Sequence, residues 1–463
     1  MAATRFGSDS ASAGPLILVT ALAATAVGAA AWNPGLVIAG ICGLIALLAP
    51  AWGAVLTLVA VAVSPIVAGT DAGRALNYAP AALTLVGWGL GLLRKGHPVR
   101  MLPRPLTVWF VVYILWTVFT AALSQHAIPG FVQAFRFALL LAITTAIWNL
   151  WSRDSYRTSL LLLAAGLSLV GILSAREIAA RSLLDILVGQ GLSPDRKIGL
   201  YGNSNILGVF MGHAMIILTP VLLSFRWPSM PARAAILVPL ITISLAACAV
   251  SMFSTFSRGA YLYAGLGCGL LLLQHRRLRW GVVAGAILGM GGVALSQAGG
   301  LLALVLRVGS GLTYRENLWS AGWRMMLDHP WTGIGSGLRV FEYHRPEYIE
   351  TFASRGLEVT QHGGAHNIFI TKGAEMGVIG LLLIIAIFVL IWMRVPEGLR
   401  RYRDGDWISG VAAAGITGLS ARAFFETGNT LGYGHIEDSL PFLVFALILL
   451  LPPQAPNRSS SSP

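Results

Sequence analysis

The sequence is poor in charge and in cysteine. Only 11% of its 463 residues are Asp, Glu, Lys or Arg, whereas soluble domains carry about 25%. The three cysteines, Cys42, Cys248 and Cys268, all lie inside apolar runs, so we expect free thiols and neither a disulfide nor a zinc site. These scarcities exclude an ordinary soluble enzyme, a disordered protein and a nucleic-acid-binding protein.

Apolar residues are abundant instead: they make up 56% of the chain, and the mean hydropathy is +0.73. A membrane-spanning helix needs roughly 17–25 largely apolar residues, and such runs recur along the whole sequence. We therefore predict an all-α, polytopic integral membrane protein with about 12–14 transmembrane helices, forming a single membrane domain over residues 1–463. The candidate runs are 15–31, 35–49, 52–69, 79–93, 106–123, 133–151, 158–174, 204–224, 233–253, 258–274, 280–296, 367–393, 407–424 and 438–452.

Basic residues indicate the topology, because short cytoplasmic loops are enriched in Lys and Arg. If the runs alternate, the basic loops fall on one side together with Arg5 and the polar stretch 457–463, so we expect both termini to be cytoplasmic. These loops, with affinity for anionic membrane lipids, account for the net charge of +13. The first apolar run, which ends at 28–31, fits an uncleaved span better than a cleaved signal peptide.

On the opposite, non-cytoplasmic side, the long segment 297–366 is predicted to be a structured loop with helices. Thr313-Tyr-Arg-Glu316 has the pattern of a capping box, and a helix over about 314–328 places Arg315 in its first turn. Arg315 is either functional or an interfacial residue that extends to water. The turn Gly333-Ile-Gly335-Ser-Gly337 could bind phosphate through backbone amides, but a plain turn is favoured because no lysine follows.

A histidine precedes the next long apolar run. In Gln361-His362-Gly-Gly-Ala-His366-Asn367, Asn367 can cap the incoming helix, which places His366 at the outer mouth of a span. A histidine there can accept a proton near neutral pH, as a general base does, although an interfacial histidine is the simpler interpretation. His362 and His366 also suggest a metal pair, but no nearby carboxylate completes a ligand set. We therefore expect no metal and no cofactor.

Other polar residues open spans on the same side. Arg258 begins one run, where an arginine is costly unless it faces the bundle or a ligand, and Asn203 and Asn205 begin another. A set of arginines, a histidine and amides at one membrane face suits glycosyl transfer from a lipid diphosphate. Guanidinium groups can bind the leaving diphosphate bidentately in place of a metal.

Two further arginines, Arg136 and Arg422, lie nearer other run ends. They could join this set or merely pair with Glu426. Asp404-Gly-Asp406 resembles the paired-acid metal motif of nucleotide-sugar glycosyltransferases, but it lies in a very short basic loop. We therefore give it no functional role.

The spacing from His366-Asn367 to Gly377-Val-Ile-Gly380, together with several other segments, resembles the signature region of the O-antigen ligase and polymerase superfamily, most closely the ligases. The clear resemblance covers about 200–380. The other segments that carry it are Tyr201-Gly-Asn-Ser-Asn205, Ser257-Arg258-Gly-Ala260, Arg315-Glu-Asn-Leu-Trp319, Asp328-His-Pro330, Gly333-Ile-Gly335 and Glu375-Met-Gly377.

The resemblance implies a metal-independent, inverting membrane glycosyltransferase of the GT-C type. It implies an undecaprenyl-diphosphate-linked glycan as donor, used at the periplasmic face of the bacterial inner membrane. By position, Arg258 and Arg315 would bind the diphosphate, and His366 would activate the acceptor hydroxyl. The substrate-binding candidates are Asn203, Asn205, Arg339, Arg345, His362 and Asn367, with the two loop arginines as auxiliary groups.

Three functions remain open. An O-antigen ligase moves a finished glycan to the lipid A-core in lipopolysaccharide biosynthesis, whereas a polymerase of the same superfamily adds to another carrier-linked unit of O-antigen or exopolysaccharide. A flippase or transporter makes no bond, and it predicts functional charges in mid-membrane and pseudo-symmetric halves. This sequence gathers its charges at one face, so transport ranks last, and the histidine motif favours the ligase.

Overall fold

The computed structural model describes residues 42–63, 71–96, 98–187, 199–201, 203–225, 232–284, 315–337, 339–348, 364–428 and 430–453. Regular structure in these ranges is helical, and no described residue lies in a strand, so the all-α prediction is confirmed. In chain order the elements are α3 (Pro50–Val63), α4 (Asp71–Lys95), α5 (Arg104–Leu123), α6 (Ala127–Leu150), α7 (Arg153–Leu187), the 3-10 turn η2 (Gly199–Tyr201), α8 (Ser204–Ser224), α9 (Ala232–Phe253), α10 (Arg258–Leu273), α13 (Arg315–Asp328), α14 (Val340–Tyr348), α15 (Ile368–Trp392), α16 (Val395–Arg403), α17 (Trp407–Ala423) and α18 (Ile436–Leu450).

Within the described part of the chain, 6 helical segments are long and apolar enough to cross a membrane. Shorter apolar helices at Pro50–Val61 and Arg258–Leu273 accompany them. The architecture is therefore that of a polytopic membrane protein, as predicted. The run 15–31, part of the run 35–49 and most of the run 280–296 lie outside the described residues, so the total of about 12–14 spans stays a prediction.

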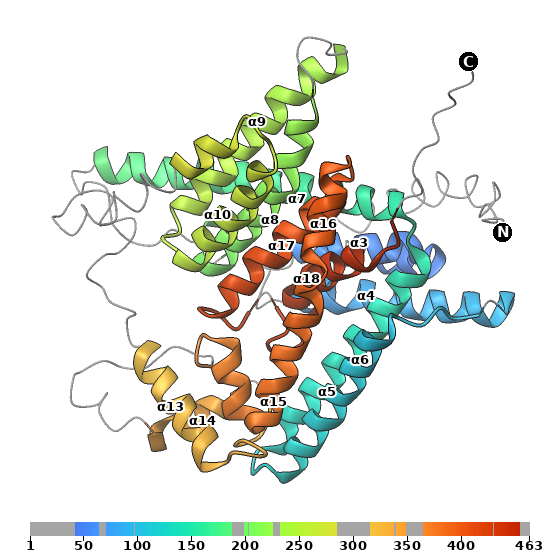
Figure 1. Ribbon diagram of the computed structural model, residues 1–463, viewed down its shortest axis with the longest axis vertical. Helices are drawn as coiled ribbons and strands as arrows, with labels where there is room; N and C mark the ends of the chain where they lie inside the picture. The colour runs from blue at the N-terminus through green and yellow to red at the C-terminus, as the bar shows by residue number, and fades with distance from the viewer. Residues whose placement is uncertain are drawn as a thin grey trace.

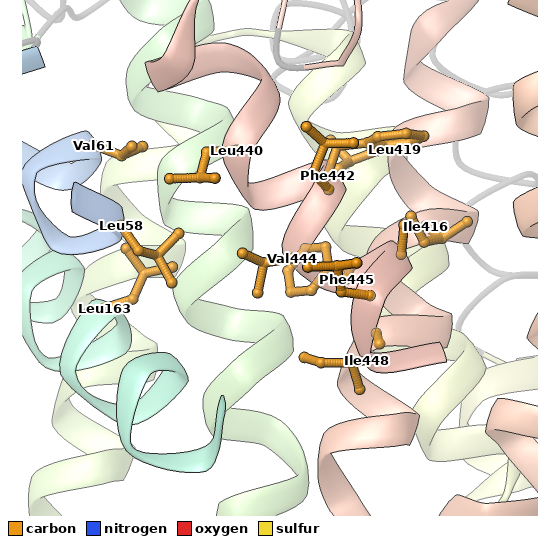
Figure 2. Close-up of a cluster of buried hydrophobic side chains, with 14 of the residues drawn as sticks. Leu58, Val61, Leu163, Ile416, Leu419, Leu440, Phe442, Val444, Phe445 and Ile448 are labelled. Atoms are coloured by element: carbon orange, nitrogen blue, oxygen red, sulfur yellow. The ribbon is translucent and has the colours of Figure 1, made fainter. Parts of the chain in front are cut away.

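Helix α18 is enclosed on all sides. Each of its residues from Ser439 to Leu449 is buried, as expected for a helix that is apolar around its whole circumference. Figure 2 shows its side chains between those of α17 and those of α3 and α7. The labelled side chains are Leu440, Phe442, Val444, Phe445 and Ile448 of α18, with Ile416, Leu419, Leu58, Val61 and Leu163 around them.

Peripheral helices, by contrast, expose apolar side chains on one face. On α5, Leu115 and Phe119 are exposed, whereas Phe110 and Tyr113 on the other side of the helix are buried. An exposed apolar face of this extent marks an interface in a soluble protein. On a helix that crosses a membrane, it is the face that lipid covers.

Helices α13 and α14 form a small cap beside the start of α15 (Figure 1). Leu318, Ala321 and Met325 of α13 make its buried face, together with Phe341 of α14 and Ala374 of α15. The helix predicted over about 314–328 is confirmed as α13, while Thr313 of the predicted capping box lies outside the described residues.

Helix α15 is broken at Gly377. This residue has φ 69° and ψ −167°, a conformation that is essentially restricted to glycine. A break in a helix leaves backbone groups without their usual partners, and buried backbone groups must find new ones. Val378 N–H donates to the carbonyl of Pro330 at 2.8 Å, and the indole N–H of Trp116 donates to the carbonyl of Met376 at 3.0 Å.

The glycine-rich turn Gly333–Gly337 supplies the other hydrogen bonds to the backbone of α15 near this break. The N–H groups of Ile334 and Gly335 donate to the carbonyls of Ala374 and Glu375 at 2.9 and 3.0 Å. An added Cβ on Gly333 would lie 2.4 Å from the backbone carbon of Glu375, so only glycine allows this approach. The turn therefore attaches the cap to α15. Its backbone N–H groups at Ile334 and Gly335 donate hydrogen bonds to carbonyl groups of α15.

Candidate functional site

Glu426 is the centre of a polar cluster that joins four segments distant in sequence. Its side chain, just beyond α17, is 9% exposed. Oε1 accepts hydrogen bonds from Nη2 of Arg315 at 2.7 Å and from Nδ2 of Asn205 at 3.1 Å. Oε2 lies 3.0 Å from Nδ1 of His366. One carboxylate therefore holds the predicted base and one of the predicted diphosphate-binding arginines together.

Arg315 is the first residue of α13, so its side chain lies where the cap meets the bundle. Besides Glu426, it binds the backbone: Nη1 donates to the carbonyl of Phe425 at 2.6 Å. These two bonds use only part of the guanidinium fork, which has five N–H donors. The side chain is 23% exposed, so the remaining donors are accessible to a ligand.

His366 has a left-handed backbone conformation, with φ 52°. Such a conformation costs a non-glycine residue about 1–2 kcal/mol, so its neighbours must hold it. The preceding Ala365 is bound at both backbone groups, because its N–H donates to Oγ1 of Thr371 at 3.1 Å and its carbonyl accepts from Nε1 of Trp319 at 2.9 Å. The next residue, Asn367, caps α15 as predicted, with its side chain accepting from two backbone N–H groups. The ring of His366 is thereby fixed in direction.

The start of α8 supplies the amide in the cluster. Asn205 accepts a hydrogen bond from Oγ of Ser257 at 2.9 Å, while its own amide donates to Glu426. Asn203 is the N-cap of α8 and accepts from the N–H groups of Asn205 and Ile206. Asn205 is therefore in the cluster, and Asn203 orders the turn that presents it.

The start of α10 lies against the same carboxylate. An added Cβ on Gly259 would be 3.5 Å from Cγ of Arg422 and 3.7 Å from Cγ of Glu426. Arg258, the neighbouring first residue of α10, has an exposed side chain. Arg422 is 2% exposed, and its Nη1 donates to the carbonyl of Gly428 at 2.7 Å. Two arginines, Arg315 and Arg422, thus act on Glu426, and a third, Arg258, begins the helix that lies against it.

Four helices begin at this cluster: α8, α10, α13 and α15. The first turn of a helix has N–H groups without helical partners and a partial positive charge. Converging helix N-termini, combined with arginines, form a site suited to an anion. Without a bound anion, the carboxylate of Glu426 balances part of this positive charge.

The charge state of Glu426 fixes the role of each nitrogen in His366. Burial by itself raises the pKa of Glu426, but the hydrogen bond from His366 and the positive charges of Arg422 and Arg315 outweigh it and lower the pKa to about 2. An ionised carboxylate only accepts hydrogen bonds. Nδ1 of His366 must therefore carry the proton, which leaves the lone pair on Nε2, the arrangement required of a general base.

The remaining candidates lie elsewhere. Arg339 is exposed and has φ 79°, just before α14, and Arg345 lies in the last turn of α14. Both belong to the cap and not to the group bonded directly to Glu426. Asn367 uses its side-chain oxygen to cap α15. His362 lies outside the described residues.

The two arginines that the sequence left unassigned have different partners. Arg136 lies 3.2 Å from Nε2 of His435, on the side of α6, whereas Arg422 lies beside Glu426. From the sequence, Glu426 was expected only as a possible partner of one of these arginines. Glu426 is central because four segments converge on it. The one signal in the sequence that could have identified it was the presence of an acid between two apolar runs at the arginine-rich face.

Within the described residues, no group of three or more His, Cys, Asp or Glu is placed to hold a metal ion. The fold and the site define a polytopic α-helical membrane protein with an arginine-rich, histidine-containing site at one end of its helices. Residues 241–385 match the family model described as O-antigen ligase. The resemblance to the O-antigen ligase and polymerase superfamily of membrane glycosyltransferases is thereby confirmed.

The matched region contains Arg258, Arg315 and His366 but ends before Arg422 and Glu426. Asn205 of the cluster lies before the matched region, so three residues of the cluster are outside it. No curated protein gives a significant match to the chain.

Proposed function

We propose that this protein is an O-antigen ligase, which transfers a glycan from undecaprenyl diphosphate to a hydroxyl group of the lipid A-core. The observation that carries the proposal is the shared carboxylate of Glu426, which binds Arg315 through one oxygen and His366 through the other. An anion-binding group and a proton acceptor are thus held side by side, as transfer from a diphosphate donor requires.

The donor diphosphate is held by Arg258 and Arg315 at the converging helix N-termini. The arginine fork binds phosphate oxygens through two parallel hydrogen bonds, and charge that develops on the leaving diphosphate is stabilised by these fixed donors. A metal ion is not required for this purpose, so the reaction is metal-independent. Arg422 adds positive charge behind Glu426.

His366 acts on the acceptor. Its Nε2 takes the proton from the acceptor hydroxyl, while Glu426 stabilises the imidazolium through Nδ1. The oxygen attacks the anomeric carbon, a new C–O bond forms, and the bond from that carbon to the diphosphate oxygen breaks with its electron pair leaving on the diphosphate. A single displacement from the opposite face inverts the anomeric configuration. The geometry follows the pattern in which a carboxylate orients a histidine base.

The site faces the periplasm in this proposal, and the protein is a multi-pass component of the bacterial inner membrane with both termini in the cytoplasm. Polymerisation, in which a second carrier-linked unit is the acceptor, is the alternative within the same superfamily. A flippase or transporter would need no residue arranged as a base. The hydrogen bond between His366 and Glu426 therefore favours glycosyl transfer.

The test is a deletion of this gene in its native host, followed by gel electrophoresis of the lipopolysaccharide and extraction of the carrier lipids. Bare core together with long polymer on undecaprenyl diphosphate is the expected result. Core that carries single repeat units would identify a polymerase. Unchanged lipopolysaccharide and carrier lipids would overturn both.

Complementation then connects the phenotype to the site. His366→Ala should fail to restore the wild-type gel pattern although it accumulates in the membrane. His275→Ala is the matched control, because His275 bonds to Tyr402 beyond the opposite end of α10 and should restore it. Full complementation by His366→Ala would contradict the role of this histidine as the base.

A further inference from the structure

A buried ion pair lies in the first half of α15, the helix that follows His366, and the proposed chemistry does not use it. Nζ of Lys372 and Oε2 of Glu375 are 2.5 Å apart on α15, and both side chains are 0% exposed. Burying two charges is expensive even when they pair, and an apolar pair of similar volume is often at least as stable. A purpose other than stability therefore has to be considered for this pair.

Tyr433 connects the ion pair to the histidine segment. The ammonium of Lys372 lies 4.9 Å from the centre of the Tyr433 ring, a cation–π contact. The hydroxyl of the same tyrosine faces Gly364, where an added Cβ would lie 2.5 Å from it. Gly364 is two residues before His366. The ion pair thus supports the backbone that carries the histidine.

A second connection runs in parallel. Oγ1 of Thr371, next to Lys372, accepts from the N–H of Ala365 at 3.1 Å and lies 3.3 Å from Oγ1 of Thr427. Thr427 directly follows Glu426. Two contacts therefore join the chain around His366 to the chain around Glu426. One is between Thr371 and Thr427, and the other is between Gly364 and Tyr433.

From this geometry we infer that Lys372, Glu375 and Tyr433, which we call the buried clamp, position His366 against Glu426. The inference rests on the proposed function and names positioning residues for it. The left-handed backbone of His366 needs such support, and a displacement of about 1 Å in a catalytic group can lower a rate about a hundredfold. None of the three side chains is in the group bonded to Arg315, so donor binding should not depend on them.

Tyr433→Phe is the sharpest variant. It keeps the ring over Lys372 and removes only the hydroxyl that faces Gly364. We expect turnover to fall about tenfold or more with the KM for the donor unchanged. Tyr156→Phe is the matched control, because Tyr156 is also fully buried but packs on Trp151 at the other end of the molecule. The double variant Lys372→Met/Glu375→Gln, which leaves no unpaired charge, should show the same loss of turnover.

A second readout does not require activity. Diethyl pyrocarbonate modifies neutral imidazole, so the profile of modification at His366 across pH, followed by peptide mass spectrometry, reports how its surroundings hold the ring. The charged groups that act there are Glu426, Arg315 and Arg422. Glu426→Gln should shift this profile toward more modification, because the ring loses the carboxylate that holds it, and Tyr433→Phe should shift it in the same direction.

The two hypotheses fail in different ways. If Glu426→Gln shifts the modification profile while Tyr433→Phe and the double variant leave both profile and turnover at wild-type values, the buried clamp does not position His366. The proposed function then stands. If the wild-type protein performs no transfer, the proposed function fails, while a shifted profile in Tyr433→Phe still supports the clamp.

Discussion

Replacement of Glu426 by Gln is the most informative perturbation of the site. The amide keeps the volume of the carboxyl group but loses its charge, so Arg315 loses an ionic partner and His366 loses the carboxylate that accepts from its Nδ1. The pKa of Glu426 lies at about 2 instead of the ordinary 4.5, which corresponds to about 3 kcal/mol of net interaction with the surrounding positive charges. If the transition state uses all of this interaction to hold His366 as imidazolium, the loss is about a hundredfold in rate.

The assay is transfer from a purified undecaprenyl-diphosphate-linked oligosaccharide to lipid A-core, with protein reconstituted in nanodiscs and rates normalised to folded protein. Asp406→Asn is the matched control. Asp406 is also 9% exposed at its side chain and also pairs with an arginine, Arg153, but in the loop before α17. This variant loses a carboxylate that pairs with an arginine far from His366, so it should keep its rate per folded molecule.

The rate of this variant tests Glu426 as the partner of the base. A neutral amide cannot stabilise the imidazolium that forms when His366 takes the acceptor proton, so the transfer rate of Glu426→Gln should stay low at every pH. A variant that keeps more than about a third of the wild-type rate would refute the assignment of Glu426 as the partner of the base.

Three other predictions concern the same cluster. Arg258→Lys and Arg315→Lys keep the charge but lose the planar fork, so each should lower the transfer rate at least about tenfold; near-normal rates in both would argue against bidentate binding of the diphosphate. Extraction with EDTA should leave the rate unchanged, and a loss that Mg²⁺ restores would contradict the metal-independent mechanism. The folded-state pKa of Glu426 is lowered, so its stabilisation should be present above about pH 5 and disappear as the pH falls to about 2. Thermal unfolding of wild type and Glu426→Gln should therefore converge at low pH.

Local signals in the sequence were sufficient for the helices and for one cap. The apolar run 106–123 became α5 (Arg104–Leu123), and Asn367 caps α15 because its short side chain follows a turn and precedes a long apolar run. These features depend on residues close to one another in the chain. The same holds for the capping-box pattern at Thr313–Glu316 that predicted the helix α13.

Features that depend on tertiary convergence were not accessible. The run 367–393 indicated one continuous span, but Gly377 breaks it, because the turn at Gly333 supplies the replacement hydrogen bonds from a distant segment. The pairing of Lys372 with Glu375 inside that same run was not predicted, since an average over apolar residues conceals a buried ion pair. The role of Glu426 could not be predicted, because it depends on four segments that meet only in the folded protein.

The break in α15 leads to a last prediction about how the cap is attached. Gly377→Ala would place a Cβ 2.4 Å from the carbonyl oxygen of Trp331, in a backbone conformation that already disfavours a side chain by about 1–3 kcal/mol. Neither strain can be relieved by a rotamer change, because the neighbour is backbone. We therefore expect a large loss of folded protein in fluorescence-detected size exclusion.

Gly373→Ala, one turn earlier in α15, is its control. The nearest atom to that Cβ is the Sδ atom of Met326 at 2.7 Å, and a methionine side chain can move aside. This variant should therefore fold at near wild-type levels. Equal folding of the two variants would show that the left-handed break is not fixed by the Pro330–Gly335 turn. In that case the cap would be free to shift relative to α15, and the position of Arg315 against Glu426 would have to be maintained by their own hydrogen bonds alone.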